Sequence, residues 1–369
     1  MDIHHLLAGI QALTWQHVLM MAIGGGLIYF AIAKEYEPVL LLPIGVGCLL
    51  ANLPLSALIS EGGLLTILYQ AGVSNELFPL LIFLGVGAMM DFRPLLSQPL
   101  FALMGAAGQF GIFGTLVLAT LLGYDLNEAA SIGIIGAIDG PTSIYVSALL
   151  APHLLAPIAV AAYSYMSLVP IIQPPIMRLM TTQAERRIHM EYAPRPVSRL
   201  AMILFPLLVT LIVGVWVPEA APLIAMLMVG NLLKESGVVE RLNQSAQNEI
   251  INVATIFLGL AIGGTMTADK FLNLRTLGIM LLGLLAFALD TAAGVLFGKL
   301  LCLLSGRRIN PLVGAAGISA FPMSGRLVQR VAQEADSSNF VLMHAMGANT
   351  AGQLGSVIAG GVLLALLGS

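Results

Sequence analysis

Long apolar runs separated by short polar loops recur along almost the whole chain. Residues 199–217 contain one charged side chain, and residues 274–304 contain three. A helix needs about 20 apolar residues to cross a bilayer, where each backbone polar group must find its partner within the protein. The runs therefore predict an all-α polytopic membrane protein. Composition agrees, because only 9% of the 369 residues are charged, whereas a soluble domain is about a quarter charged.

The apolar runs predict about ten transmembrane helices in a single membrane domain that covers residues 1–369. The predicted helices are 17–34, 37–54, 77–91, 99–123, 152–180, 199–217, 220–235, 250–266, 274–304 and 339–367. Two further apolar segments, residues 128–150 and 310–335, are interrupted by Gly and Pro and contain polar residues. Irregular backbone persists at membrane depth only where protein or a wet cavity surrounds it. We therefore predict that both segments are re-entrant hairpins.

Basic residues fall mainly in alternate loops. The loops after the odd-numbered spans contain 11 of the 16 Lys and Arg residues: Lys34, Arg93, Arg178, Arg186, Arg187, Arg195, Arg199, Lys234, Arg241, Arg307 and Arg308. The loops on the other side contain only Lys270 and Arg275. The positive-inside rule places the first set in the cytoplasm. The sequence thus predicts a multi-pass protein of the cell (inner) membrane with both termini outside.

The two halves of the chain share a faint repeat. IFLGVGAMMDF at residues 82–92 is similar to IFLGLAIGGTMTADKF at residues 256–271, and Asp139 then falls opposite Ser319. An odd number of spans separates equivalent positions, so repeats at about 17–180 and 199–367 would have inverted topology. Inverted repeats with broken helices are typical of ion-coupled transporters. The alternative is a chance similarity between apolar sequences.

Two of the acidic residues, Asp139 and Asp290, fall at membrane depth. A charge there costs at least about 2.5–3.5 kcal/mol. Gly140 allows a sharp turn after Asp139, and Pro141 suits the first turn of a helix. A carboxylate and freed carbonyl oxygens at a helix break suit a hard cation, so Na⁺ or H⁺ is the predicted ligand. The alternative for Asp139 is a simple helix cap, and for Asp290 a structural or interface role.

The second broken segment carries Asn310 and Gly314, which are expected to share a helical face, and Ser319, three residues before Pro322. Arg326 follows, and an Arg at this depth needs an anion, either Asp139 or a substrate carboxylate that it can bind bidentately. Otherwise Arg326 lies solvated at the cytoplasmic mouth.

Three more polar residues follow the broken segments. Tyr163 and Tyr165 come after the first and Asn349 after the second, at roughly equivalent places in the two halves. A Tyr hydroxyl is able to donate a proton, although either ring also suits helix packing. His344 is interpreted as a hydrogen-bonded packing residue.

These residues lie in motifs that resemble a known family. GAIDGPTS, AVAAYSYMSLVPIIQPPIM, INPLVGAAGISAFPMSGR and QEADSSNFVLMHAMGANTAG are similar to segments of the β subunit of the sodium-pumping, biotin-dependent decarboxylases. Those complexes act on oxaloacetate, methylmalonyl-CoA or glutaconyl-CoA. The resemblance runs from LGVGAMMDF to the C-terminus, which is nearly the whole chain.

The resemblance implies a function and a set of partners. A carboxyltransferase would load CO₂ onto biotin on a carrier domain, and this subunit would decarboxylate the carboxybiotin, consume a proton and move Na⁺ outward. The partners would be a carboxyltransferase/biotin-carrier subunit and a small membrane-anchoring subunit. The family's fold implies an elevator-like transporter and a homotrimer. No nucleic acid partner is expected.

The resemblance also implies site residues. Asp139, Asn310, Gly314, Ser319 and Asn349 would form the Na⁺ site. Tyr165 would complete the site or relay a proton, and Arg326 would bind the carboxylate of carboxybiotin or regulate Na⁺ release. One rival hypothesis is a stand-alone Na⁺-coupled carboxylate symporter, which would need the same ion site but no biotin. The second is a non-transporting membrane scaffold for a decarboxylase.

Overall fold

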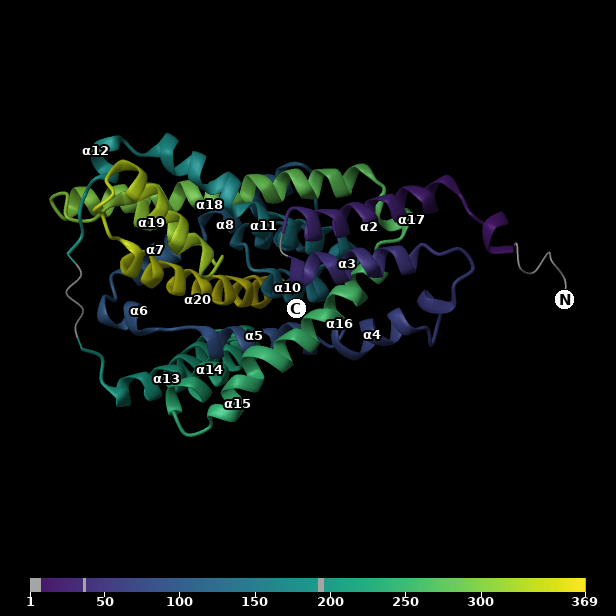
Figure 1. Cartoon of the computed structure of the whole chain (residues 1–369), viewed down its shortest axis with the longest axis horizontal. Helices are drawn as coiled ribbons and strands as arrows, with labels where there is room; N and C mark the ends of the chain where they lie inside the picture. The colour runs from purple at the N-terminus through teal and green to yellow at the C-terminus, as the bar shows by residue number, and fades with distance from the viewer. Residues whose placement is uncertain (1–7, 36–37, 192–195, 369) are drawn as a thin grey trace.

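The computed structural model describes residues 8–35, 38–191 and 196–368, and its regular structure there is entirely helical, most long helices running along the long axis of the molecule (Figure 1). The first half contains α2 (Trp15–Ala33), α3 (Pro38–Ala51), η1 (Ala57–Ile59), α4 (Leu64–Gly72), α5 (Leu77–Met89), α6 (Arg93–Ser97), α7 (Phe101–Ala107), α8 (Phe110–Leu121), α9 (Leu126–Gly133), η2 (Ile134–Ala137), α10 (Gly140–Leu150), η3 (Pro152–Leu154), α11 (Leu155–Met180) and α12 (Gln183–Arg186). The second half contains α13 (Arg199–Trp216), η4 (Pro218–Ala220), α14 (Ala221–Ser236), α15 (Glu240–Ser245), the π-helical η5 (Ala246–Ile250), α16 (Ile251–Gly264), α17 (Ala268–Phe271), α18 (Leu274–Leu304), η6 (Pro311–Gly317), α19 (Met323–Ala335) and α20 (Leu342–Leu367).

The helices confirm the membrane class but not the full count of spans. Six helices in the described residues are long and apolar enough to cross a membrane, and two helix pairs, bent by 55° and 63°, raise the number to eight if each pair is one span. Two predicted spans form shorter helices, α3 with 14 residues and α14 with 16. The count of ten spans therefore stays a prediction.

Two helix crossings depend on glycine. A Cβ at Gly87 of α5 would lie 1.8 Å from the Leu227 carbonyl oxygen, and one at Gly230 of α14 would lie 2.0 Å from the Leu84 carbonyl oxygen. The α3–α16 crossing has the same character, because a Cβ at Gly263 would lie 2.1 Å from a carbonyl oxygen of α3. Small residues allow this close approach in membrane helices, where the lipid supplies no hydrophobic drive for association. Each crossing joins a helix of the first half to one of the second.

The first broken segment unwinds where the sequence places Asp139. α9 tightens into the 3₁₀-helix η2, Ile138 adopts a left-handed φ of 54°, and Asp139 is extended before α10 begins. Gly140 and Pro141 then form the first turn of α10. The expected break is therefore present, but whether the segment re-enters the membrane stays a prediction.

The second broken segment is wound differently from the expectation. Residues 311–317 form the 3₁₀-helix η6, Ile318 is extended, and α19 starts at Met323 after a cis Phe321–Pro322 bond. Asn310 is the N-cap of η6 and lies outside the helix. The prediction that Asn310 and Gly314 share an α-helical face is therefore wrong, because a 3₁₀ turn contains about three residues and Asn310 precedes it.

The two breaks meet in the interior of the protein. The backbone N–H of Ser319 donates to the Ala137 carbonyl oxygen at 3.1 Å. Ser319 and Asp139 are each 4% exposed. Backbone groups freed by unwinding thus find partners within the protein, as the absence of water in a bilayer requires.

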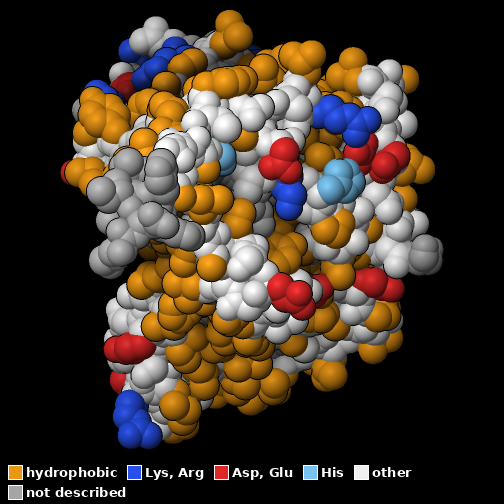
Figure 2. Space-filling model, turned by 90° about the vertical axis from the view of Figure 1, so that its right-hand side faces the viewer, with side chains coloured by type: hydrophobic (Ala, Val, Ile, Leu, Met, Phe, Trp, Pro, Cys, Tyr) orange, Lys and Arg blue, Asp and Glu red, His pale blue; other side chains and the backbone are white. Residues whose placement is uncertain are grey.

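Both ends of the molecule carry ion pairs. Arg178 and Glu334 pair at 2.7 Å beside α12 and α19, which Figure 1 shows at one end. At the opposite end, Glu128 accepts from Arg275 at 2.8 Å and from His153 at 3.0 Å. Figure 2 shows acidic, basic and histidine side chains on this opposite end, bordered by hydrophobic side chains.

Candidate ion-binding site at the broken helices

Asp139 is held by α20 as well as by its own helix. Its Oδ2 accepts from the Gln353 amide at 2.6 Å and from the Ser356 hydroxyl at 2.8 Å. Its Oδ1 accepts from the Thr142 backbone N–H at 3.3 Å, which is the geometry of an N-cap. The capping alternative is therefore correct for one oxygen, while the other oxygen makes contacts that no cap requires.

No basic side chain neutralises Asp139 among the described residues, because none lies within ion-pair distance of its carboxylate. Its partners are an amide, a hydroxyl and a backbone N–H, together with the N-terminal dipole of α10. A buried ionised carboxylate is expensive without a paired charge. The site is therefore electrostatically suited to a cation or to a proton.

Further oxygen atoms surround the junction. The Ser319 hydroxyl donates to the Gly352 carbonyl oxygen at 2.9 Å, and the Asn349 amide donates to the Ile318 carbonyl oxygen at 2.7 Å. The Oδ1 of Asn349 is buried and accepts no hydrogen bond from the described residues. The structure thus brings Ser319 and Asn349 together with the unwound backbone, next to the residues of α20 that bind Asp139.

Gln109 adds a contact from the break between α7 and α8. Its amide nitrogen lies 3.1 Å from the Gly105, 3.2 Å from the Gly317 and 3.2 Å from the Gly352 carbonyl oxygens. Its Oε1 is buried and has no partner among the described residues. Three interrupted helices and α20 therefore converge on one polar region.

The two tyrosines have different surroundings. A Cβ at Gly140 would lie 2.1 Å from Cε1 of Tyr163, so the Tyr163 ring packs directly on the residue after Asp139. The Tyr165 hydroxyl instead donates to the Met280 carbonyl oxygen of α18, and its ring faces Gly283. The predicted role of Tyr165 is untested, and the residue against the start of α10 is Tyr163.

Asn310, Gly314 and Arg326 contact other elements. The Asn310 amide donates to the Arg186 and Ile188 carbonyl oxygens at 3.0 and 2.9 Å. Gly314 packs against the backbone of Gly294 in α18. Arg326 is exposed on α19, and none of the ion pairs among the described residues involves it. Their assignment to the site stays a prediction.

The surroundings of Asp290 fit the structural role that was one of the alternatives predicted for it. It is fully buried in α18, and its Oδ1 accepts from the Gly111 N–H in the first turn of α8. A Cβ at Gly136 of η2 would lie 2.8 Å from its Oδ2, which has no hydrogen-bond partner among the described residues. Asp290 therefore caps a third interrupted helix beside the first broken segment.

Sequence reasoning missed Gln353 and Ser356, although a signal was present. Asn349, Gln353 and Ser356 recur at spacings of four and three residues in an otherwise apolar run, which places them on one helical face. A polar stripe on a membrane helix has to face the protein interior. Gln109 had no such signal, because its role depends on the interruption between α7 and α8.

The donor set is that of a hard monovalent cation. One carboxylate, hydroxyl and amide oxygens, and unwound carbonyl groups lie together, and no group of three or more His, Cys, Asp or Glu residues suited to a transition metal occurs in the described residues. Oxygen ligands favour alkali and alkaline-earth ions, and a single carboxylate matches one positive charge. The fold and this site fit an ion-transporting membrane protein.

Comparison with known proteins gives the family. Residues 16–367 match the family described as the Na⁺-transporting oxaloacetate decarboxylase beta subunit. The chain is 53% identical to the methylmalonyl-CoA decarboxylase subunit beta of Veillonella parvula, over 98% of this chain and 95% of that one. It is 50% identical to the glutaconyl-CoA decarboxylase subunit beta of Acidaminococcus fermentans, over 98% and 96%. It is 47% identical to the oxaloacetate decarboxylase beta chain of Klebsiella pneumoniae, over 96% of both.

The chain therefore belongs to the β-subunit family of the Na⁺-transporting decarboxylases. Sodium transport, a decarboxylase complex and apolar membrane helices all fit this family, and the predicted resemblance is confirmed.

Proposed function

We propose that this subunit decarboxylates carboxybiotin, presented by a carrier domain of a partner subunit, and uses the reaction to move Na⁺ outward while consuming a proton. The observation that carries the proposal is Asp139, which is 4% exposed, has only neutral donors around it and lies where two unwound segments touch. Na⁺ is then the transported substrate. Asp139, Ser319 and Asn349 supply its oxygen ligands, while Asn310 and Gly314 hold the second segment in place or complete a second site.

The reaction and the transport have to share one element with two states. Moving one charge against 100 mV costs about 2.3 kcal/mol. Occupancy by Na⁺ and the carboxybiotin state must therefore both bias that same element. Tyr165 relays the proton or completes the ion site, and Arg326 binds the carboxylate of carboxybiotin or controls Na⁺ release.

The architecture proposed for this transport is a pair of inverted repeats that move as an elevator. The supporting observation is the matched pair of glycine crossings, in which α5 packs on α14 and α16 packs on α3. The ten spans, the two re-entrant hairpins and the inner-membrane location belong to the same proposal. So do the carboxyltransferase/biotin-carrier and small membrane-anchoring partners and the homotrimer.

The test is Asp139→Asn in the native complex, reconstituted in vesicles. Removing the charge should abolish Na⁺ uptake and lower Na⁺ affinity at least about tenfold, since a contact to a charged group is worth about 1.5–3 kcal/mol. Radioactive Na⁺ uptake and the rise of the unfolding temperature in Na⁺ relative to K⁺ provide the measurements. The proposal would not survive if Asp139→Asn kept both the uptake and the stabilisation.

The matched control is Asp290→Asn, the same change at another fully buried carboxylate. It should lower the unfolding temperature but keep the Na⁺-dependent rise. Transport of a dicarboxylate by the isolated chain, without a biotin carrier, would favour the symporter instead.

A further inference from the structure

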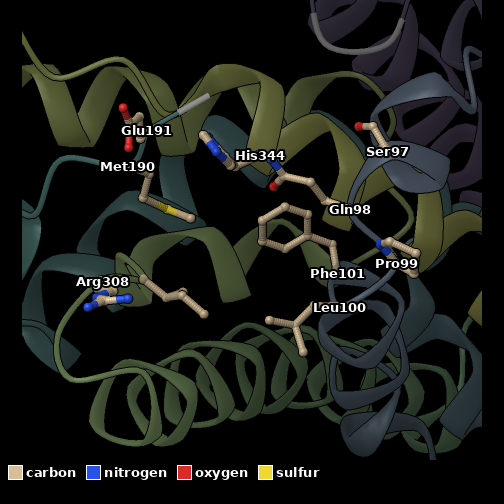
Figure 3. A pocket seen from close by; sticks show the side chains of 10 residues that line it. Ser97, Gln98, Pro99, Leu100, Phe101, Met190, Glu191, Arg308 and His344 are labelled. Atoms are coloured by element: carbon tan, nitrogen blue, oxygen red, sulfur yellow. The ribbon is translucent and has the colours of Figure 1, made fainter. Parts of the chain in front are cut away.

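A cavity of about 440 Å³ opens beside the start of α20. The residues of α20 that bind Asp139, Gln353 and Ser356, lie farther along the same helix. Its walls come from the segment between α6 and α7, from residues 190–191, from residues 308–309 and from His344 of α20. Figure 3 shows these side chains around the cavity, with Arg308 on one side of it and Ser97, Gln98 and Pro99 on the other. The volume is in the range of small-molecule sites, about 300–1,000 Å³.

The lining combines an apolar wall with a few polar groups. Leu100 and Met190 provide the accessible apolar contacts above the buried Phe101, while Gln98 offers an amide next to them. The Phe101 and His344 rings lie edge to face, with centroids 5.6 Å apart at 79°. This combination suits a compact, partly apolar ring system that carries a planar polar group.

The charge at the rim suits a carboxylate. Arg308 is exposed, and no ion pair among residues 8–35, 38–191 and 196–368 involves it. Glu191 is the other charged residue of the lining, and Figure 3 shows its carboxylate turned away from the centre of the cavity. A guanidinium binds a planar carboxylate through two parallel hydrogen bonds.

The cavity is joined to the ion site by a single helix. His344 lies in the first turn of α20, and the same helix carries Asn349, Gln353 and Ser356. Nine residues separate His344 from Gln353, which corresponds to roughly 14 Å along the helix axis. Because a helix is stiff over this length, a displacement of α20 at the cavity also displaces the groups that hold Asp139.

The packing around the cavity makes α20 sensitive to a ligand there. A Cβ at Gly347 would lie 3.3 Å from both the Phe101 ring and the Pro94 carbonyl oxygen, so α20 lies tightly against the segment that forms one cavity wall. Interiors packed this closely transmit displacements instead of absorbing them.

We infer that this cavity receives the carboxylated ureido ring of carboxybiotin, with Arg308 against its carboxylate, and that α20 transmits the occupancy of the cavity to Asp139. The inference rests on the proposed function and adds the location of the substrate and the connecting element. Arg326 is outside the cavity lining, so its remaining role is the control of Na⁺ release. The substrate ring contacts Gln98, Leu100 and Met190, whereas Phe101 and His344, 3% and 2% exposed, form the packed base of the cavity.

The first test is Arg308→Gln in the native complex, with Arg307→Gln as the matched control, because Arg307 is the neighbouring exposed Arg and does not line the cavity. The carrier is loaded with carboxybiotin, and CO₂ release is followed in a single turnover below carrier saturation. Arg308→Gln should slow release about 10- to 100-fold, the effect of losing a contact between charged groups. Arg307→Gln should leave the rate unchanged, and both variants should keep the Na⁺-dependent rise of the unfolding temperature.

A second measurement does not depend on whether Arg308→Gln folds. Gln98→Cys, titrated with a maleimide, should be protected by the carboxybiotin-loaded carrier, whereas Gln183→Cys on the exposed face of α12 should react equally with and without it. Wild-type complex that releases no CO₂ from carboxybiotin would overturn the proposed function itself. Normal release by wild type and Arg308→Gln alike, with no protection at position 98, would overturn only the cavity assignment.

Discussion

The contact between Gly140 and Tyr163 allows a test of how the first broken segment positions Asp139. Replacing Gly140 with Ala adds one methyl group, whose carbon would lie 2.1 Å from Cε1 and 2.6 Å from the hydroxyl oxygen of Tyr163. Carbon atoms in good contact are about 3.5–4.0 Å apart, so the overlap is about 1.4 Å or more. Either the ring or the start of α10 must move, and Asp139 is the residue immediately before that start.

Two opposing effects set the sign of the result. Gly140 lies in the first turn of a helix at an ordinary negative φ, where Ala is preferred by about 0.5–1 kcal/mol. Overpacking in a closely packed interior costs about 1–3 kcal/mol. The crowding should therefore dominate, with a net loss of about 1–2 kcal/mol of stability. If half of this loss is expressed as displacement of the carboxylate, the half-saturating Na⁺ concentration rises by about twofold to fivefold.

The assay is the Na⁺ dependence of the unfolding temperature together with Na⁺-activated CO₂ release by the complex. Gly140→Ala should need more Na⁺ for half of either effect. A second substitution, Tyr163→Leu, removes the ring atoms that the methyl group would meet and should restore much of the Na⁺ response. Gly114→Ala in α8 is the control, because a Cβ at this less crowded helical glycine would have its nearest contacts 3.9 Å away.

The reasoning would be refuted by a Gly140→Ala protein that is more stable than wild type and has an unchanged Na⁺ response. That result would mean that the start of α10 can adjust without moving Asp139. Failure of Tyr163→Leu to improve the Gly140→Ala protein would refute the steric cause alone.

Two further predictions concern the ends of the molecule. Glu128→Gln should lower the free energy of unfolding by about 1 kcal/mol, a value kept small because Arg275 is largely exposed. A double-mutant cycle with Arg275→Gln should give a coupling energy of at least about 0.3 kcal/mol. Additive effects of the two substitutions would show that the ion pair does not contribute to stability. The Ser338 hydroxyl and His189 lower the pKa of Asp336 to about 2. Since the folded pKa is the depressed one, the stability due to Asp336 is present above about pH 4 and is lost as the pH falls toward about 2. Asp336→Asn should therefore lower the unfolding temperature more at pH 5 than at pH 2.5, and an equal or larger effect at pH 2.5 would contradict this.

The sequence was most informative where a combination of residues had a single physical explanation. Asp139 followed by Gly140 and Pro141 predicted an unwound site in the right place, because no unbroken lipid-facing helix accommodates that combination. Apolar runs predicted the membrane class for the same reason. The exact winding was harder to predict, since η6 is a 3₁₀-helix and its surroundings, not its intrinsic preference, select that form.

The partners of Asp139 depend on tertiary contacts that no local pattern specifies. Gln353 and Ser356 lie more than 200 residues from Asp139 along the chain. Their helical spacing reveals a buried polar face, but only the packing of α20 on α10 identifies the carboxylate that they bind. Gln109 and Tyr163 could be assigned only from the structure, in which Gln109 lies at the interruption between α7 and α8 and the Tyr163 ring packs on Gly140.

Under the proposed function, the distribution of these contacts would let α20 respond to both Na⁺ and carboxybiotin. α20 binds the first broken segment through Gln353 and Ser356, and it binds the second through Asn349 and the Gly352 carbonyl oxygen. A Na⁺ ion that takes over the Asp139 oxygens competes with the first pair of contacts, while the Ser319 and Ile318 contacts can persist. Ion binding at the proposed site would thus change how α20 is attached to one segment but not to the other, which is the differential interaction that coupling requires. A ligand that displaces the start of α20 acts on the same contacts from the other end of the helix.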